Sequence, residues 1–235
     1  MILHKNRFGY KVTISIIVST IIILTSALYI YNINFLETNR SYEAVNGILD
    51  LQSWEMIRNV YLDGEWEFYP GVLLDPSDGV NIFENHSQIR KHVSVPGSWE
   101  PYINNNGEAE GSGTYRLTIK LPKDERYGIK TRTIRSSNRI YLNGEEVANM
   151  GNPSLDRNNF KPASKYKLGF GRSNNQELEI VIHVSSYEYR SGGIIRSIEF
   201  GTLESMLRRD QMDRGIDALI ISVCLVLSVY FFLTY

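Results

Sequence analysis

NRIYLNGEEVANMG, residues 138–151, has the pattern of a β-hairpin. Asn143 and Gly144 are the residue types that adopt the two positive-φ positions of a type I′ turn, whose twist matches that of antiparallel strands. With these two residues as the loop, the expected cross-strand pairs are Leu142–Glu145, Tyr141–Glu146 and Ile140–Val147. Apolar residues alternate on both arms, which favours a hairpin over an irregular Asn-Gly loop.

Further segments alternate between apolar and polar residues as half-buried strands do. Residues 115–121 place Tyr, Leu, Ile and Leu on one face before Pro122, and residues 177–184 place Leu, Ile, Ile and Val on one face. The other expected strands are residues 62–69, 91–95, 129–135 and 194–200. About eight short strands, separated by Gly, Pro and Asn turns and without an intervening amphipathic helix, predict an antiparallel β-sandwich or jelly roll.

The composition excludes several classes of protein. The chain has 235 residues, 43% hydrophobic and 22% charged, with a formal net charge of -1. It contains no basic run with interleaved aromatic residues, so nucleic acid is not an expected partner. Its single cysteine, Cys224, excludes an intrachain disulfide. Both ends are apolar and the middle is polar, so the chain divides into three parts.

The first part has the pattern of a membrane anchor. Residues 1–11 carry Lys5, Arg7 and Lys11, and residues 12–31 are 20 residues without a charge. About 20 apolar residues span a bilayer core, and the preceding cations place the N-terminus in the cytoplasm. A cleaved signal peptide is the alternative, because Thr25-Ser26-Ala27 resembles a cleavage site. Both readings export the middle of the chain, behind a linker at residues 32–49.

The last part predicts a second membrane helix, over residues 216–235, which are apolar except for Asp217. Residues 202–215 have apolar residues at helical spacing and many charges, which predicts a juxtamembrane helix that either transmits a signal or only connects. The apolar run still continues at Tyr235, so we expect the chain to be the front part of a longer protein. Residues 50–201 remain as one exported sandwich domain.

Four short segments of that domain resemble, in order, the sugar-binding jelly-roll domain of family-two glycoside hydrolases: LDGEWEF (62–68), VPGSWE (95–100), GTYR (113–116) and YLNG (141–144). VSSYEYRSGG (184–193), followed by a charged helix and an apolar segment, is similar to the exported domain of bacterial seven-transmembrane receptors with diverse intracellular signalling modules. The second resemblance implies a galactose-binding-like jelly roll outside, seven helices, and a kinase or cyclase inside. It covers residues 50–235 and is favoured, because hydrolases place a catalytic barrel after the jelly roll.

The residues themselves give little support for catalysis. Glu65 and Glu67 share a strand face, but a surface pair of this kind is ordinary, and a glycosidase needs two carboxylates that flank one bond. The histidines lack ligand spacing and no Gly-x-Ser-x-Gly elbow occurs. We therefore expect no enzyme activity in this chain, no cofactor and no metal ligands, while a structural Ca²⁺ remains open.

Binding is the expected role, because sugar sites combine aromatic platforms with polar side chains. The candidate ligand-binding residues are Trp99, Glu100, Tyr102, Tyr187, Tyr189 and Arg190. Trp99 has a second interpretation, as a plug at the end of the sandwich, and Trp54 and Trp66 are expected in the core. The residues expected to form structural turns are Pro96, Gly97, Asn143, Gly144, Gly192 and Gly193.

The sequence thus predicts a ligand-sensing domain on the outer side of a cell membrane, at the front of a signalling receptor. Its expected partners are a carbohydrate or another small ligand from the cell envelope and the lipid bilayer, with a homodimer left open. The alternative is a non-catalytic sugar-binding accessory domain of a membrane-associated glycoside hydrolase. A weaker alternative is a truncated product with no activity of its own.

Overall fold

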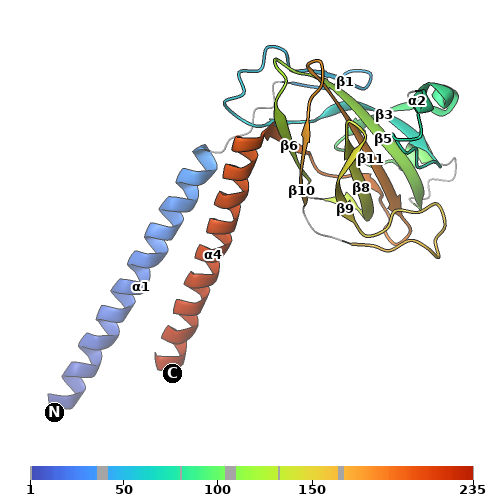
Figure 1. Ribbon diagram of the computed structural model, residues 1–235. Helices are drawn as coiled ribbons and strands as arrows, with labels where there is room; N and C mark the ends of the chain where they lie inside the picture. Colours follow the sequence, from blue (N-terminus) through green and yellow to red (C-terminus); the bar gives the residue numbers. More distant parts are fainter. Residues whose placement is uncertain are drawn as a thin grey trace. The chain divides into compact units, whose positions relative to one another are not determined.

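The computed structural model describes residues 2–35, 42–79, 81–103, 110–131, 133–163 and 167–234. The chain forms two units: Thr38–Met206, and Met1–Glu37 together with Leu207–Tyr235. The first unit is the β domain and the second is the helical unit (Figure 1).

The β domain is built from two main sheets. The larger sheet has the order β4-β3-β5-β11-β8-β9, with β1 parallel to β5 and the other neighbours antiparallel. Its strands are β1 (Ile48–Asp50), β3 (Gly64–Pro70), β4 (Lys91–Val95), β5 (Gly111–Lys120), β8 (Ser137–Leu142), β9 (Glu145–Met150) and β11 (Glu177–Ser186). This mainly antiparallel architecture agrees with the predicted β-sandwich class.

The second sheet has the order β10-β6-β13-β2, with antiparallel neighbours. Its strands are β2 (Val60–Tyr61), β6 (Arg126–Thr131), β10 (Lys167–Arg172) and β13 (Glu199–Thr202). A small two-stranded sheet pairs β7 (Ile134–Arg135) with β12 (Gly193–Ile194). Three short helices complete the domain: α2 (Ile82–Asn85), η1 (Ser87–Ile89) and α3 (Glu100–Ile103).

The hydrophobic core is formed by the inward faces that the alternation predicts. Leu117 and Ile119 of β5 and Ile180 and Ile182 of β11 are fully buried. Trp54 and Trp66 are also buried, which confirms them as core residues. Trp54 packs against Tyr127 and Phe200, at ring distances of 6.3 and 5.9 Å. The domain therefore has one extended aromatic and aliphatic core.

A second apolar cluster lies on the outer face of the larger sheet. The chain between β3 and β4, residues 71–79 and 81–90, forms a strap over this face. Its side chains Leu74 and Phe83 pack against Tyr69, Tyr141 and Val181. His183, which the alternation places on the solvent side, is instead 4% exposed. The strap is the reason, because its Leu74 carbonyl is hydrogen-bonded to His183 Nε2 at 2.7 Å.

The hairpin of β8 and β9 has the predicted turn and a different register beyond it. Asn143 and Gly144 have φ of 48° and 81°, as a type I′ turn requires. The pairs at Leu142 and Tyr141 match the prediction, but Ile140 pairs with Ala148 instead of Val147. The register shifts at the step from Ile140 to Tyr141, where β9 has one extra residue, Val147, as in a β-bulge.

Two stretches in which the sequence predicts no strand contribute strands to the sheets. The expected linker, residues 32–49, reaches into β1, and its Ala44 and Leu49 are 2% and 0% exposed. The stretch between residues 151 and 175 contains β10, which pairs with β6. β1 is only three residues long, and β10 has glycine, an uncommon strand residue, at two of its six positions. Both strands are ordered by pairing with strands distant in the sequence.

Helices occur at both ends of the chain, where the sequence predicts them. They are α1 (Ile2–Phe35) and α4 (Leu203–Thr234). Over the part of the chain that the structure describes, neither is long and apolar enough to cross a membrane. The two segments expected as membrane helices are therefore helical, but the expectation that they span a membrane has no support.

The junction between β13 and α4 has no linker. Thr202 ends the strand and caps the helix, because its Oγ1 accepts a hydrogen bond from the Ser205 amide at 3.2 Å. One turn later Met206 is fully buried. It lies against Gly128 of β6, where an added Cβ would be 2.9 Å from Met206 Cγ. The first turn of α4 is thus fixed to the second sheet by a cap and by a buried side chain.

Candidate functional site

Four loop segments meet at one end of the β domain, and we call them the loop cluster: residues 97–103, 133–136, 151–163 and 187–193. Gly97 donates its amide hydrogen to the Ile194 carbonyl at 2.8 Å, and Ala163 donates to the Ser136 carbonyl at 3.4 Å. β7 and β12 pair Arg135 with Gly193. The two candidate segments from the sequence, at residues 99–102 and 187–190, are therefore neighbours in space.

Trp99 is placed as the plug and not as a binding platform. Its side chain is fully buried, and its ring stacks on Tyr115 at 6.4 Å and packs on Phe68 at 5.9 Å. Gly192 lies against the indole, where an added Cβ would be 2.2 Å from Nε1. The requirement for glycine at this position follows from that close approach. Because no ring face of Trp99 is exposed, a sugar cannot stack on it in this conformation.

Glu100 and Tyr102 support the loops. Glu100 Oε1 accepts a hydrogen bond from the Gly192 amide at 3.1 Å, which ties α3 to the turn before β12. The Tyr102 carbonyl accepts a hydrogen bond from Lys91 Nζ at 2.8 Å, and its half-buried ring packs on the core. Both residues lie at the rim of the loop cluster, where they hold its shape.

Tyr187 joins two segments of the loop cluster. Its hydroxyl donates to the carbonyls of Leu155 at 2.9 Å and Ser154 at 3.2 Å, and its ring meets Phe160 edge-on at 5.2 Å. The backbone carbonyl of Tyr187 accepts a hydrogen bond from Arg157 at 3.2 Å. With its hydroxyl committed to the backbone, Tyr187 acts as a brace for the 151–163 loop.

Tyr189 is the aromatic residue of the candidate set whose ring faces solvent, with 45% exposure. The guanidinium of Arg135 lies 5.5 Å from its ring centroid. Arg135 Nη1 also donates to Ser191 Oγ at 2.6 Å, and Arg190 beside it is exposed. Sequence reasoning missed Arg135, because its neighbourhood depends on the pairing of β7 with β12, two strands of two residues each.

A second polar group, the charged cluster, lies on the outer face of the larger sheet. It comprises Glu67, Arg90, Arg116, Glu179 and Tyr69. Glu67 is 8% exposed and accepts from Arg90 at 3.1 Å, Arg116 at 3.2 Å and Tyr69 at 2.9 Å. Burial, reinforced by the Glu67 carboxylate, raises the pKa of the Tyr69 phenol to about 12.

The charged cluster corrects the expectation that Glu65 and Glu67 form an exposed pair. Glu65 is exposed, whereas both Glu67 oxygens are used by Arg and Tyr partners under the strap. Arg116 is also held from above, because its guanidinium lies 4.3 Å from the Phe83 ring centroid. Because Phe83 and Arg90 belong to the strap, these contacts attach the strap to the larger sheet. Within the described residues, no group of three or more His, Cys, Asp or Glu side chains is placed to hold a metal ion.

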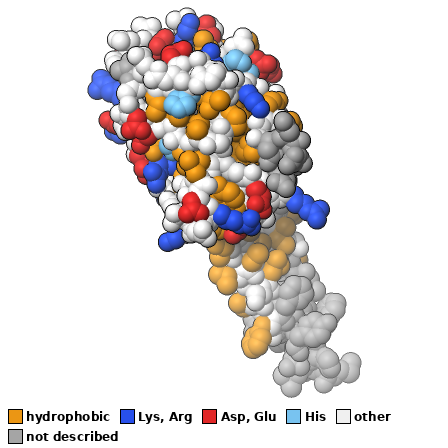
Figure 2. Space-filling view, turned by 90° about the vertical axis from the view of Figure 1, so that its right-hand side faces the viewer, with side chains coloured by type: hydrophobic (Ala, Val, Ile, Leu, Met, Phe, Trp, Pro, Cys, Tyr) orange, Lys and Arg blue, Asp and Glu red, His pale blue; other side chains and the backbone are white. Residues whose placement is uncertain are grey.

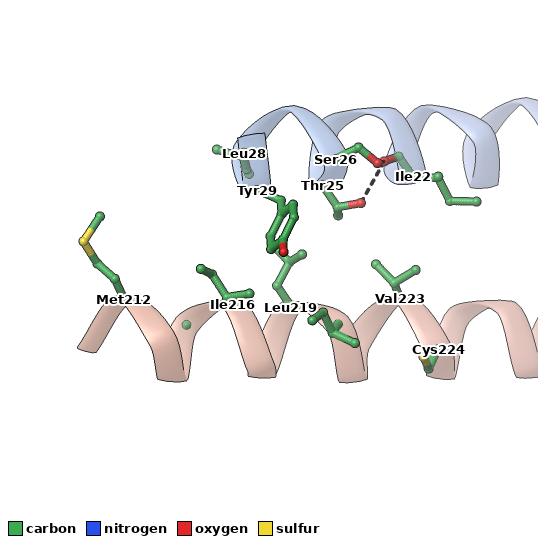
Figure 3. Close-up of a pocket in the computed structure, with 12 residues that line it drawn as sticks. Ile22, Thr25, Ser26, Leu28, Tyr29, Met212, Ile216, Leu219, Val223 and Cys224 are labelled. Atoms are coloured by element: carbon green, nitrogen blue, oxygen red, sulfur yellow. Dashed lines mark hydrogen bonds between the residues drawn. The ribbon is translucent and has the colours of Figure 1, made fainter. Parts of the chain in front are cut away.

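The helical unit contains an apolar cleft of about 590 Å³ between α1 and α4 (Figure 3). Two of its polar side chains are turned back on their own helix, since the hydroxyls of Thr25 and Ser26 both donate to the Ile22 carbonyl at 2.8 Å. The lining residues are Ile22, Thr25, Ser26, Leu28, Tyr29, Met212, Gly215, Ile216, Leu219, Ile220, Val223 and Cys224. A cleft with this lining suits apolar chains and offers little to a sugar.

The visible surface of the β domain carries no dominant charge. Figure 2 shows acidic and basic side chains interspersed around a group of hydrophobic side chains on one face. This distribution is in keeping with the net charge of -1. That face does not offer the continuous basic surface that a nucleic acid would need.

Comparison with known proteins gives a limited result. No family model matches the sequence, and no curated protein matches it. Similar solved structures include Ruminococcus gnavus beta-glucuronidase, at TM-score 0.43 and 15% identity over 62% of this chain and 28% of that one. They also include a GH2 beta-galacturonidase from Eisenbergiella tayi bound to galacturonate, at TM-score 0.43 and 12% identity over 63% of this chain and 25% of that one.

These neighbours are glycoside hydrolase chains, and this chain spans about a quarter of their length. A TM-score of 0.43 is too low to carry an argument about fold or function. No comparison bears on the resemblance to seven-transmembrane receptors.

Proposed function

We propose that the β domain is a non-catalytic binding domain for a carbohydrate or a similar polyhydroxylated ligand, which it takes at the loop cluster. The observation that carries the proposal is the exposed ring of Tyr189, held on a rigid framework and bordered by Arg135 and Ser191. Sugars present apolar C–H faces and hydroxyl edges, so an open aromatic ring beside fixed hydrogen-bonding groups is the arrangement they require.

The framework supports binding because it is already formed. Trp99 fills the interior beneath the 187–193 turn, Glu100 holds Gly192, and Tyr187 braces the 151–163 loop. Ordering the loops therefore adds no large entropic cost to association. Within this proposal, Tyr189 and Arg190 contact the ligand, whereas Trp99, Glu100, Tyr102 and Tyr187 position them.

The test is the Tyr189→Ala variant of the full chain in detergent, titrated with a panel of oligosaccharides. The wild type should show a ligand-dependent rise in melting temperature, since a ligand at 100 times its Kd stabilises by about 2.7 kcal/mol. Tyr189→Ala should lose that rise and keep its ligand-free melting temperature. Ile57→Ala is the matched control, because Ile57 is 75% exposed and lies outside the loop cluster. A wild type that responds to no sugar at millimolar concentration would overturn the proposal.

A second proposal concerns location: the helical unit attaches the chain to a lipid bilayer, with the β domain outside the cytoplasm. Most of the exposed large hydrophobic side chains lie on α1 and α4, among them Ile17, Ile23, Leu24, Ile221 and Phe232. Clusters of exposed apolar residues mark contact with a membrane or another protein. Residues 12–31 carry no charge, whereas residues 1–11 carry three cations, which favours a cytoplasmic N-terminus.

Location is tested by fractionating cells and extracting the membranes with alkaline carbonate. The chain should stay with the membranes, and external protease should cut the β domain in intact cells. Release by carbonate would contradict the attachment, and protection of the β domain until lysis would contradict the orientation. A role as the sensing part of a signalling receptor and a role as an accessory domain of a hydrolase both include this binding site. A ligand-dependent change in α4 that reaches a signalling output would favour the receptor.

A further inference from the structure

Arg135 differs from four other arginines of the β domain in what its side chain contacts. Arg90, Arg116, Arg139 and Arg157 each have a carboxylate partner within 3.4 Å. Across the described residues, the contacts of Arg135 are the Ser191 hydroxyl and the Tyr189 ring, and no carboxylate pairs with it. It is a half-buried cation without a counter-ion, at the centre of the proposed site.

The position of Arg135 is fixed from three directions. Its backbone pairs with Gly193 in the β7–β12 ladder, Ser191 accepts a hydrogen bond from Nη1, and the guanidinium carbon lies over the Tyr189 ring at 5.5 Å. Of the three guanidinium nitrogens of Arg135, Nη1 is the one that makes a hydrogen bond within the described residues. The Nε and Nη2 edge of the guanidinium therefore keeps two parallel N–H donors, and this fork matches the two oxygens of a carboxylate.

We infer that the ligand of this site carries a carboxylate, as a sugar acid does, and that this group binds the Nε and Nη2 edge of Arg135 while the sugar ring lies on Tyr189. The inference rests on the proposed function and adds to it the charge of the ligand. A carboxylate on the ligand would be the counter-ion that Arg135 does not have among the described residues. A neutral sugar would leave a half-buried cation unpaired, which favours an acidic ligand over its neutral counterpart.

The experiment measures affinity of the full chain in detergent by calorimetry for matched ligands. Galacturonate and glucuronate oligosaccharides are compared with the neutral galactose and glucose oligosaccharides of the same linkage, and with a sulfated analogue. The acidic ligand should bind the wild type about tenfold or more tightly than the neutral one. This preference should shrink between about 20 mM and 500 mM salt, because salt screens an ion pair that is partly open to solvent.

Three variants complete the test. Arg135→Gln should abolish the preference for the acidic ligand, because it should lower the affinity for the acidic ligand much more than the affinity for the neutral one. Arg135→Lys should retain part of the preference, because it keeps the charge and loses the fork. Arg126→Gln is the matched control, since Arg126 is an exposed cation at the start of β6 and should change nothing. Melting temperatures without ligand show that each variant is folded.

The remaining outcomes separate this inference from the proposed function. If acidic and neutral sugars bind the wild type equally, or if Arg135→Gln weakens both equally, the carboxylate is wrong and sugar binding stands. If the sulfated analogue alone depends on Arg135, the carboxylate is again wrong. If no sugar of any charge binds the wild type, the proposed function fails and the inference fails with it.

Discussion

His183 is a titratable residue that the strap removes from water. Burial lowers the pKa of its imidazole, and the hydrogen bond to the Leu74 carbonyl opposes this shift only in part. Asp75 and Glu146 raise the pKa and Arg139 lowers it, all as weaker effects than burial. The folded chain thus binds fewer protons than the unfolded chain. The neutral, buried imidazole therefore stabilises the folded chain fully above the unfolded-chain pKa of about 6.5. This contribution is lost as the pH falls below that value and through the lower pKa of the folded chain.

The corresponding prediction is a loss of stability on mild acidification. The wild-type melting temperature should fall more steeply between about pH 7 and pH 5 than that of His183→Gln, which cannot titrate and can still donate to the Leu74 carbonyl. Calorimetric melting curves across this range measure the difference. Parallel pH profiles for the two proteins would show that His183 does not govern the effect.

Glu67 permits a second prediction at this scale. Replacing Glu67 by Ala leaves Arg90 and Arg116 without the carboxylate that they share, and removes the acceptor of the Tyr69 hydroxyl. Because both arginine side chains are partly exposed, we expect a loss of about 1 to 3 kcal/mol in the free energy of unfolding, below that of a fully buried pair. Urea unfolding measures it. Glu65→Ala, at an exposed position of the same strand face, should cost less than about 0.5 kcal/mol.

At the scale of elements, the hairpin turn is the feature that the sequence predicts most directly. Gly144→Val places a β-branched side chain at a φ of 81°. An added Cβ there meets no atom within 4 Å, so the cost is backbone strain, about 1 to 3 kcal/mol of unfolding free energy. Chemical denaturation of the variant tests this. Glu145→Val introduces the same side chain at the first strand position and should be nearly neutral; equal losses from both variants would count against the turn.

The junction of β13 and α4 gives the next prediction. Met206→Ala removes a fully buried side chain from the surface of Gly128 and should lower the unfolding free energy of the β domain by about 2 to 5 kcal/mol. Thr202→Ala removes the helix cap and should cost about 1 kcal/mol. Leu207→Ala, at an exposed position one residue further, is the control. If Met206→Ala melts like the control, the first turn of α4 is not fixed to the sheet.

The strands that the sequence predicts are those that bury one face in the core, because this burial makes apolar and polar residues alternate along the strand. β5, β11, β4 and the hairpin occupy the expected residues to within a few positions. The sequence does not predict β1, because a strand of three residues is too short to show a pattern, or β10, because glycine occupies two of its six positions. The two segments that carry the candidate site residues do lie side by side, but the burial of Trp99 and the place of Arg135 depend on which loops pack together, and no local pattern shows this.

At the scale of the whole molecule, the division into two units gives a prediction about autonomy. The core cluster lies entirely within residues 44–200, so residues 42–206 contain the hydrophobic contacts of the β domain. This fragment should unfold cooperatively, with a melting temperature within a few degrees of that of the β domain in the full chain. Circular dichroism and size-exclusion chromatography check this. A fragment that remains aggregated or unfolded would show that the β domain depends on the helical unit.

The pairing of β5 with β11 has a consequence for synthesis of the chain. β5 is a central strand of the larger sheet, and one of its neighbours, β11, comes much later in the chain. In this pair Gly111 lies opposite Ser186 and Lys120 lies opposite Glu177. As the ribosome adds residues from the N-terminus, β5 emerges long before β11 exists, and its apolar side chains and unpaired edge must wait. Contacts so distant along the chain make folding slow and leave such edges open to aggregation. The larger sheet can be completed only after Ser186 has left the exit tunnel, and the edge of β5 stays open until then.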